Sequence, residues 1–239
     1  MTKTESLNSL FDAWQKRQKL LDPCGMQIRF IPDGIVDEPV FEKESKKVLF
    51  ISNEANTKYE SHDSCTSDRR KDFLEFHGTG HDSWRGKMRL RMCELYKVIA
   101  QCPDMPAKEA ALHFAMMNLN KAGGTSSTNI ERMRWYCSQF REEILEEISI
   151  IAPDVIAWCG QKTFFLASEY LGAEGDKEGK YVLPMGEKKI PLLSIWHTSY
   201  FQGRIKPADG YEPGLLDDED DPRLAELGVE YIDPDEMED

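Results

Sequence analysis

Apolar residues recur along this chain with two spacings, one typical of helices and one typical of buried strands. Steps of three and four residues predict helices over residues 6–21, 87–101 and 129–150. Short apolar runs predict strands over residues 48–51, 114–120, 154–160 and 190–196. Pro153 is expected to end the third helix, and a further helix is expected from residue 161 to a glycine cap at Gly172.

Strands and helices alternate, which predicts an α/β fold. The expected architecture is a three-layer sandwich with a short, mostly parallel four-stranded sheet flanked by helices. Residues 1–216 are expected to form a single domain, with 217–239 as an acidic C-terminal tail. Residues 53–86 are long and polar, which predicts an inserted functional loop beside a pocket.

Charge is distributed unevenly along the 239 residues. The formal net charge is −13, and residues 217–239 hold twelve acidic residues against Arg223 alone, which leaves −2 for residues 1–216. The body therefore does not exclude a nucleic-acid partner, and its basic candidates are Arg85, Lys87, Arg89 and Arg91. For the tail we expect a solvated or disordered segment, or one that contacts the chain's own DNA-binding cleft or a protein partner.

Several classes of protein are disfavoured. No apolar stretch approaches the roughly 20 residues that cross a bilayer, so we expect a cytoplasmic protein without membrane contact. The six cysteines are scattered and form no C-x-x-C pair, which argues against a disulfide scaffold or a zinc ribbon. His62, His77 and His81 lack ligand spacing, so we expect no metal.

Two predicted strands end in groups able to do chemistry. Residues 48–56 lead from an apolar run into Asn53 and Glu54, and residues 190–200 lead into His197. Ligands of open parallel sheets bind beyond the carboxyl ends of the strands. We therefore expect a carboxylate and an imidazole to face one crevice.

These segments, with the helix–Pro–strand–Gly pattern of residues 137–160, resemble the uracil-DNA glycosylase superfamily. The similarity covers roughly residues 48–200. It includes Asn118 on the second strand, Trp84 in Ser-Trp-Arg-Gly, and His197 in Trp-His-Thr-Ser, which resembles the family's His-Pro-Ser motif. It implies a parallel four-stranded sheet between helices and an enzyme that acts on a base extruded from DNA.

The resemblance also implies roles. Glu54, or Asn53 after a shift of one residue, would activate water and stabilise the sugar cation, and His197 would donate to the departing base. Asn118 and Asn120 would read the edge of the base, and Trp84 would stack on it. Phosphate contacts would come from Ser199, Tyr200 and Lys121. Ordinary structural roles stay open for each: capping for Glu54, a turn for Asn118, a satisfied strand-end histidine for His197, core packing for Trp84.

The chain departs from the family pattern at several positions. Ser52 and Ala55 replace the first motif's glycine and proline, and Thr198 replaces the proline after the histidine. Ala122 stands where the iron–sulfur branch has a cysteine, so we expect no cluster and no cofactor. The predicted function is a monomeric, monofunctional DNA glycosylase for a uracil-like or bulky modified pyrimidine, as in foreign or phage DNA. The alternatives are a non-catalytic nucleic-acid- or protein-binding member of the fold, and a nucleoside or nucleotide hydrolase.

Overall fold

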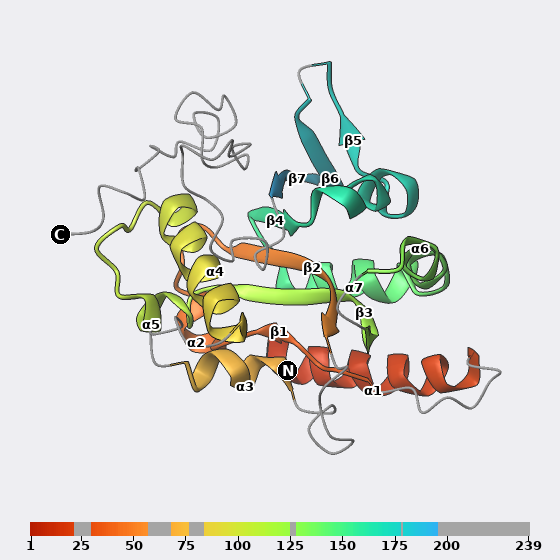
Figure 1. Cartoon of the computed structure of the whole chain (residues 1–239), viewed down its shortest axis with the longest axis horizontal. Coiled ribbons are helices and arrows are strands. Elements are labelled where there is room, and N and C mark those ends of the chain that lie inside the picture. Colours follow the sequence, from red (N-terminus) through yellow and green to blue (C-terminus); the bar gives the residue numbers. More distant parts are fainter. Residues whose placement is uncertain (22–29, 57–67, 77–83, 125–127, 178, 196–239) are drawn as a thin grey trace.

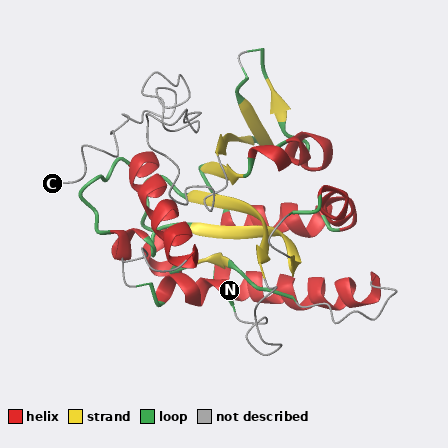
Figure 2. Cartoon of the chain, viewed as in Figure 1, coloured by secondary structure: helices red, strands yellow, loops and turns green. Residues whose placement is uncertain are grey.

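A seven-stranded mixed sheet with helices on both faces forms the centre of the molecule (Figures 1 and 2). The computed structural model describes residues 1–21, 30–56, 68–76, 84–124, 128–177 and 179–195. Its strands, in chain order, are β1 Gly34–Ile35, β2 Val48–Asn56, β3 Ala115–Gly124, β4 Val155–Cys159, β5 Glu174–Gly175, β6 Tyr181–Met185 and β7 Lys188–Ile195. Their order across the sheet is β1-β3-β2-β4-β7-β6-β5.

The predicted α/β class is confirmed, and the expected four-stranded sheet is wrong in its extent. The four predicted strands are β2, β3, β4 and β7, and they pair in parallel as neighbours. Antiparallel strands extend this group at both edges, with β1 on β3 and the β6–β5 pair on β7. Two of these added strands, β1 and β5, escaped prediction because they have two residues each, too few for any periodicity.

Helices α1 Lys3–Leu21 and α4 Trp84–Ala100 agree with two predicted helices. The predicted helix over residues 129–150 is divided into α6 Ile130–Gln139 and α7 Arg141–Ile151. The remaining helices are α2 Glu38–Phe41, α3 Arg69–Leu74, α5 Ala107–Ala110, the 3-10 helix η2 Gln161–Thr163 and the π-helix η3 Ala167–Leu171.

The division of the long helix occurs at Phe140. This residue leaves helical geometry (φ −116°, ψ 24°), and its fully buried ring packs 4.5 Å from that of Tyr136 and 6.0 Å from that of Trp14. Helix α7 ends at Ile151, and its C-cap Ala152 has left-handed backbone geometry (φ 53°) just before Pro153. The single helix predicted from residue 161 is instead the 3-10 helix η2 followed by the π-helix η3, and its predicted cap at Gly172 is confirmed, with φ 85°.

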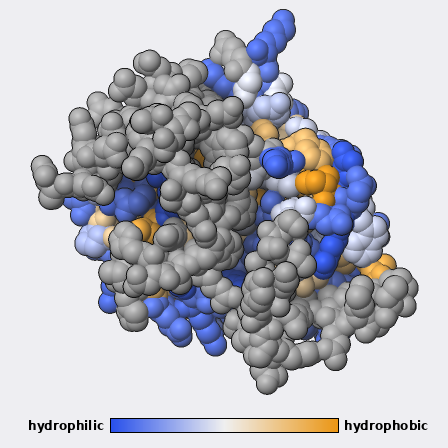
Figure 3. Space-filling view, viewed as in Figure 1, coloured by the Kyte–Doolittle hydropathy of each residue, from blue (hydrophilic) through white to orange (hydrophobic). Residues whose placement is uncertain are grey.

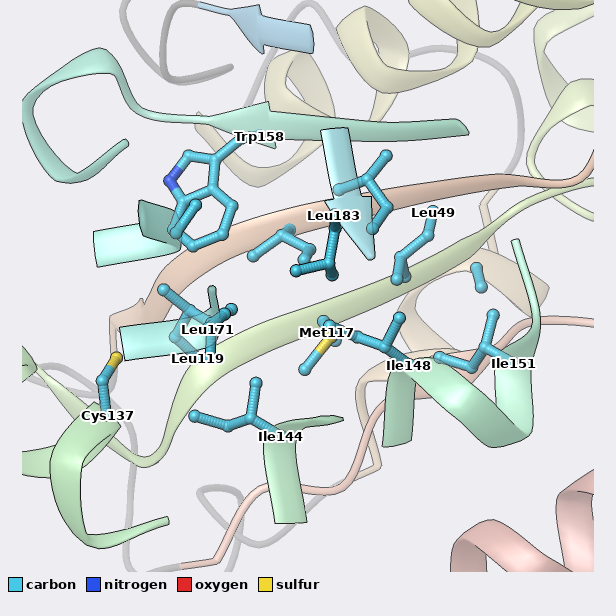
Figure 4. Close-up of a cluster of buried hydrophobic side chains, with 14 of the residues drawn as sticks. Leu49, Met117, Leu119, Cys137, Ile144, Ile148, Ile151, Trp158, Leu171 and Leu183 are labelled. Carbon is cyan, nitrogen blue, oxygen red and sulfur yellow. The ribbon is translucent and has the colours of Figure 1, made fainter. Parts of the chain in front are cut away.

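Two hydrophobic clusters cover the two faces of the sheet. Side chains alternate between the faces of a strand, and β2 contributes Leu49 and Ile51 to one cluster and Val48 and Phe50 to the other. The first cluster packs against α1, α6, α7 and η3, and the second against α3, α4 and α5. Figure 4 shows the first, with Ile144 and Ile148 of α7 directed at Met117 of β3.

The predicted loop over residues 53–86 is partly regular structure. Strand β2 continues to Asn56, α3 forms within the segment, and α4 begins at Trp84. Residues 57–67 and 77–83 lie outside the described residues, as does the acidic tail. Strand β3 extends beyond the predicted end at residue 120 and continues through Gly124.

A fully buried ionic cluster joins β3 to α7 and to the residue before β1. The ammonium of Lys121 pairs with Asp33 and lies 3.0 and 2.8 Å from the two carboxylate oxygens of Glu147, and all three side chains have no exposed surface. The ammonium also lies 5.3 and 5.4 Å from the ring centroids of Phe11 and Trp14 in α1.

This cluster holds two carboxyl groups for one ammonium. Burial raises the pKa of Glu147 well above its ordinary value, Lys121 opposes that shift, and the neighbouring Asp33 adds to it. Burial lowers the pKa of the Lys121 ammonium, but the charges of Asp33 and Glu147 outweigh this effect and raise it above its ordinary value. The arrangement is neutral when Glu147 carries a proton.

Replacement of Lys121 by Met should lower the free energy of unfolding by about 3–5 kcal/mol, because it leaves buried carboxyl groups without their counter-ion. Urea unfolding would measure the loss. The matched control is Lys188→Met, since Lys188 pairs with Asp154 at 2.7 Å but is 47% exposed, and an exposed pair contributes about 0–1 kcal/mol. Equal losses in the two variants would contradict a stabilising role for the cluster.

Replacement of Glu147 by Gln should flatten the dependence of stability on pH. Because the folded-state pKa of Glu147 is raised, its contribution is fully present below the ordinary carboxyl pKa near 4.5 and is lost as the pH rises through the folded value. The variant should therefore gain stability relative to the parent between pH 5 and pH 8. Thermal unfolding across that range would show this, and parallel curves for the two proteins would refute it.

Candidate functional site

The four parallel strands end at the same edge of the sheet. Ile51 of β2 is level with Trp158 of β4, and Cys159 of β4 is level with Ile195 of β7. Strand β2 continues beyond this level, and Glu54 pairs with Asn120 of β3. This carboxyl edge is where ligands of α/β sheets bind, and it is therefore the candidate site.

The carboxylate of Glu54 is half-buried at this edge. Oε2 accepts a hydrogen bond of 2.7 Å from Nδ2 of Asn120, and none of the described residues donates to Oε1. Burial raises the pKa of Glu54, while the hydrogen bond from Asn120 and the charge of Arg132 act in the opposite direction. The site thus holds a partly buried carboxylate, and no described residue donates a hydrogen bond to one of its oxygens.

Gly124 provides the space that this carboxylate fills. A Cβ atom at position 124 would lie 2.1 Å from Cδ of Glu54 and 2.2 Å from Oε1, which is far inside any contact distance. The pairing of β2 with β3 shifts between Glu54 and Asn56, so that Asn56 is level with Gly124. The end of β3 therefore lies directly against the carboxylate.

Asn53 occupies a different environment, because adjacent residues of a strand face opposite sides of the sheet. Its Oδ1 accepts from the hydroxyl of Thr163 at 2.5 Å, and its Nδ2 donates to Thr128 at 3.1 Å. A Cβ at Gly160, where φ is +143°, would lie 3.3 Å from Oδ1. Asn53 is 7% exposed and joins the ends of β2 and β4 to the segment before α6.

The two alternatives for the water-activating group therefore differ in availability. Both ends of the Asn53 amide are bonded to threonine hydroxyls, whereas Glu54 keeps an oxygen without a donor from the described residues. Glu54 is the better candidate for chemistry, and Asn53 is a structural link at the same edge.

Asn118 is buried and bonded to Asp33. Its backbone N–H donates to Oδ2 of Asp33 at 2.7 Å, and its side-chain Nδ2 donates to the same oxygen at 3.1 Å. The amide donor needed to read a base is thus engaged within the protein. Lys121, for which a phosphate contact was expected, has no exposed surface, so neither residue belongs to the candidate site.

The other predicted site residues lie wholly or partly outside the described residues. His197, Ser199 and Tyr200 follow Ile195, the last residue of β7, and are not described. Trp84 begins α4, but its side chain is not described. His62, His77 and His81 also lie outside the described ranges.

Sequence reasoning missed three groups that shape the site. Gly124 had a signal, because a glycine pair after an apolar run often marks a close approach of another group. Arg132, which donates to the carbonyl of Gly123 at 3.0 Å, and Thr163 had none, since their partners come from other elements.

Three described thiols are poorly suited to nucleophilic or ligand chemistry. Burial raises the pKa of Cys93, Cys137 and Cys159 to about 12, which disfavours the thiolate. Across the described ranges, no three His, Cys, Asp or Glu side chains gather in a way that could hold a metal ion.

The described part of the face in Figure 3 is mainly hydrophilic, with a few small apolar areas. No helix within the described residues has the length and apolar character needed to cross a membrane.

A scan against models of known protein families finds no match, and a search of curated proteins finds no similar sequence.

Proposed function

We propose that this protein hydrolyses the N-glycosidic bond of a base extruded from DNA. The observation that carries the proposal is the half-buried carboxylate of Glu54, held through one oxygen at the carboxyl edge of the parallel strands. The proposed substrate base is a uracil-like or bulky modified pyrimidine.

The reaction requires a carboxylate of this kind. As the bond from C1′ to the base nitrogen breaks, its electron pair leaves with the base and the sugar becomes oxocarbenium-like. An anionic carboxylate stabilises that cation and orients a water molecule, whose oxygen then bonds to C1′. The water proton is released and the base is protonated, so atoms and charges balance.

The surroundings of Glu54 favour its ionised form against the effect of burial. A hydrogen bond from a neutral amide stabilises the charged carboxylate, and the guanidinium of Arg132 adds a favourable charge. Partial burial then strengthens the interaction of the carboxylate with a developing cation, because less water screens it.

The departing base needs a donor, for which we propose His197. Strand β7 ends at Ile195, level with Cys159 of β4, and His197 follows Ile195 by two residues in the sequence. An imidazole there would donate to the base carbonyl as negative charge develops. We further propose that Trp84, the first residue of α4, stacks on the extruded base.

Replacement of Glu54 by Gln should abolish most base release while leaving DNA binding intact. Loss of a group that acts on water and charge in this way costs about 10²–10⁴-fold in rate. The assay is abasic-site formation, detected by alkaline strand cleavage, with DNA containing uracil, hypoxanthine or glucosylated hydroxymethylcytosine.

The matched control is Glu131→Gln, which makes the same change in charge at a side chain that is 80% exposed on α6. It should retain the parent rate. Failure of the parent protein to release any of the three bases would overturn the proposal, and salt-sensitive DNA binding without release would favour the non-catalytic alternative. Base release from free deoxyuridine alone would favour a nucleoside hydrolase.

The rate of base release should fall on the acid side through a midpoint above that of an ordinary glutamate. Glu54 acts as an anion, its pKa is raised by burial, and activity is therefore lost as the pH falls through that raised value. Single-turnover rates between pH 4 and pH 9 would locate the midpoint. A profile that stays flat down to pH 4.5 would contradict the role of a buried carboxylate.

A further inference from the structure

Asn120 is fully buried, and both ends of its side-chain amide are committed. Oδ1 accepts from the backbone N–H of Ala122 at 2.9 Å, and Nδ2 donates to Oε2 of Glu54 at 2.7 Å. A backbone N–H can only donate, so it determines which end of the amide is the oxygen. The amide therefore presents its donor to Glu54 and could not present an acceptor.

On its other side, the Glu54 carboxylate lies against the backbone of Gly124. Gly124 lies so close that any side chain there would overlap Cδ and both oxygens of Glu54. Arg132 fixes the adjoining residue by donating to the carbonyl of Gly123 at 3.0 Å. The carboxylate thus lies between an oriented amide and a strand end without side chains.

We infer that Asn120 is a positioning residue that, with the space left by Gly124, holds the Glu54 carboxylate in one orientation at the carboxyl edge. This inference rests on the proposed function in taking Glu54 as the group that acts on the substrate. It replaces the base-reading role expected for Asn120, because its amide contacts the carboxylate and a backbone N–H.

Orientation and charge are linked in this arrangement. A donor directed at Oε2 favours the anion and leaves Oε1, to which no described residue donates, as the oxygen available to water or substrate. Loss of the donor should therefore act twice, by making the anion less favourable and by freeing the side chain to rotate. A displacement of about 1 Å from productive geometry costs about 100-fold in rate.

The tests are Asn120→Asp, which keeps an oxygen to accept from Ala122 but puts a second carboxyl group in place of the donor to Glu54, and Asn120→Ala, which removes the donor without adding a charge. The measurement is the titration of the Glu54 carboxyl carbon by NMR in protein labelled at glutamate, with the signal assigned by its absence in Glu54→Gln. We expect the midpoint of Glu54 to move upward relative to the parent, and the acid limb of the rate profile to move with it. Asn129→Asp is the control, because that exposed N-cap side chain only accepts from Arg132 N–H.

The outcomes separate this inference from the proposed function. A Glu54 titration shifted upward in Asn120→Ala, in a protein that releases no base, would support the positioning role and overturn the function. Base release that depends on Glu54, with neither the titration nor the acid limb changed in Asn120→Ala, would overturn the positioning role. If an Asn120 variant changes the preference among the three bases but not the titration of Glu54, Asn120 reads the base instead of positioning the carboxylate.

Another variant, Gly124→Ala, serves if the Asn120 variants do not fold. Gly124 is not among the residues with positive φ, so its backbone conformation permits Ala, and the three atoms nearest to the added Cβ all belong to the Glu54 carboxylate. We expect about a 100-fold lower kcat with little change in KM, the pattern of a misplaced reacting group. In thermal unfolding, Gly124→Ala should destabilise the parent more than it destabilises Glu54→Ala, and equal shifts in both backgrounds would overturn the contact.

Discussion

The parallel pairing of β2 between β3 and β4 is the constraint on which the candidate site depends. Residues 48–51 of β2 are apolar and supply both hydrophobic clusters, so a register slip of one residue would exchange the two faces of the strand. The same slip would move Glu54 away from Asn120 and bring Asn53 into its place. The apolar half of β2 thus determines, through packing, where the polar half presents its carboxylate. The register of β2 against β3 and β4 therefore sets both the packing of the core and the position of the Glu54 carboxylate at the edge.

Much of the central sheet could be predicted because its strands are short apolar runs between helices of clear periodicity. The parallel strands and α1, α4, α6 and α7 follow from such patterns. The edge strands could not be predicted in this way, although Gly186, with φ 62° in the two-residue turn between β6 and β7, is a typical hairpin signal. The break at Phe140 was hidden because its ring continues the apolar spacing of the helix. Burial against Trp14 outweighed helical continuity there.

The candidate site was predictable in its location and less so in its membership. Glu54 follows the buried apolar part of β2, and that position alone directs it to the carboxyl edge. Asn118 and Lys121 lie on the neighbouring strand with suitable side chains, but their partner Asp33 precedes them by 85 and 88 residues. No local pattern relates residues so far apart. Residue type and strand position therefore identify candidates, and the partner of each side chain decides which of them remain available.

Glu54 and Glu147 show why a raised pKa alone does not identify a functional carboxylate. Burial is the main cause of the shift in both. Glu147 has no exposed surface and lies against Lys121 and Asp33, so its proton completes a neutral, closed cluster. Glu54 is only half-buried, and the amide of Asn120 and the charge of Arg132 oppose the rise of its pKa. No described residue donates a hydrogen bond to its second oxygen. A carboxylate that is partly removed from water, and that has an oxygen without a hydrogen-bond donor, can still interact with a positive charge that develops beside it. That combination, rather than the direction of the pKa shift, distinguishes the carboxylate that we propose as the reacting group from a structural one.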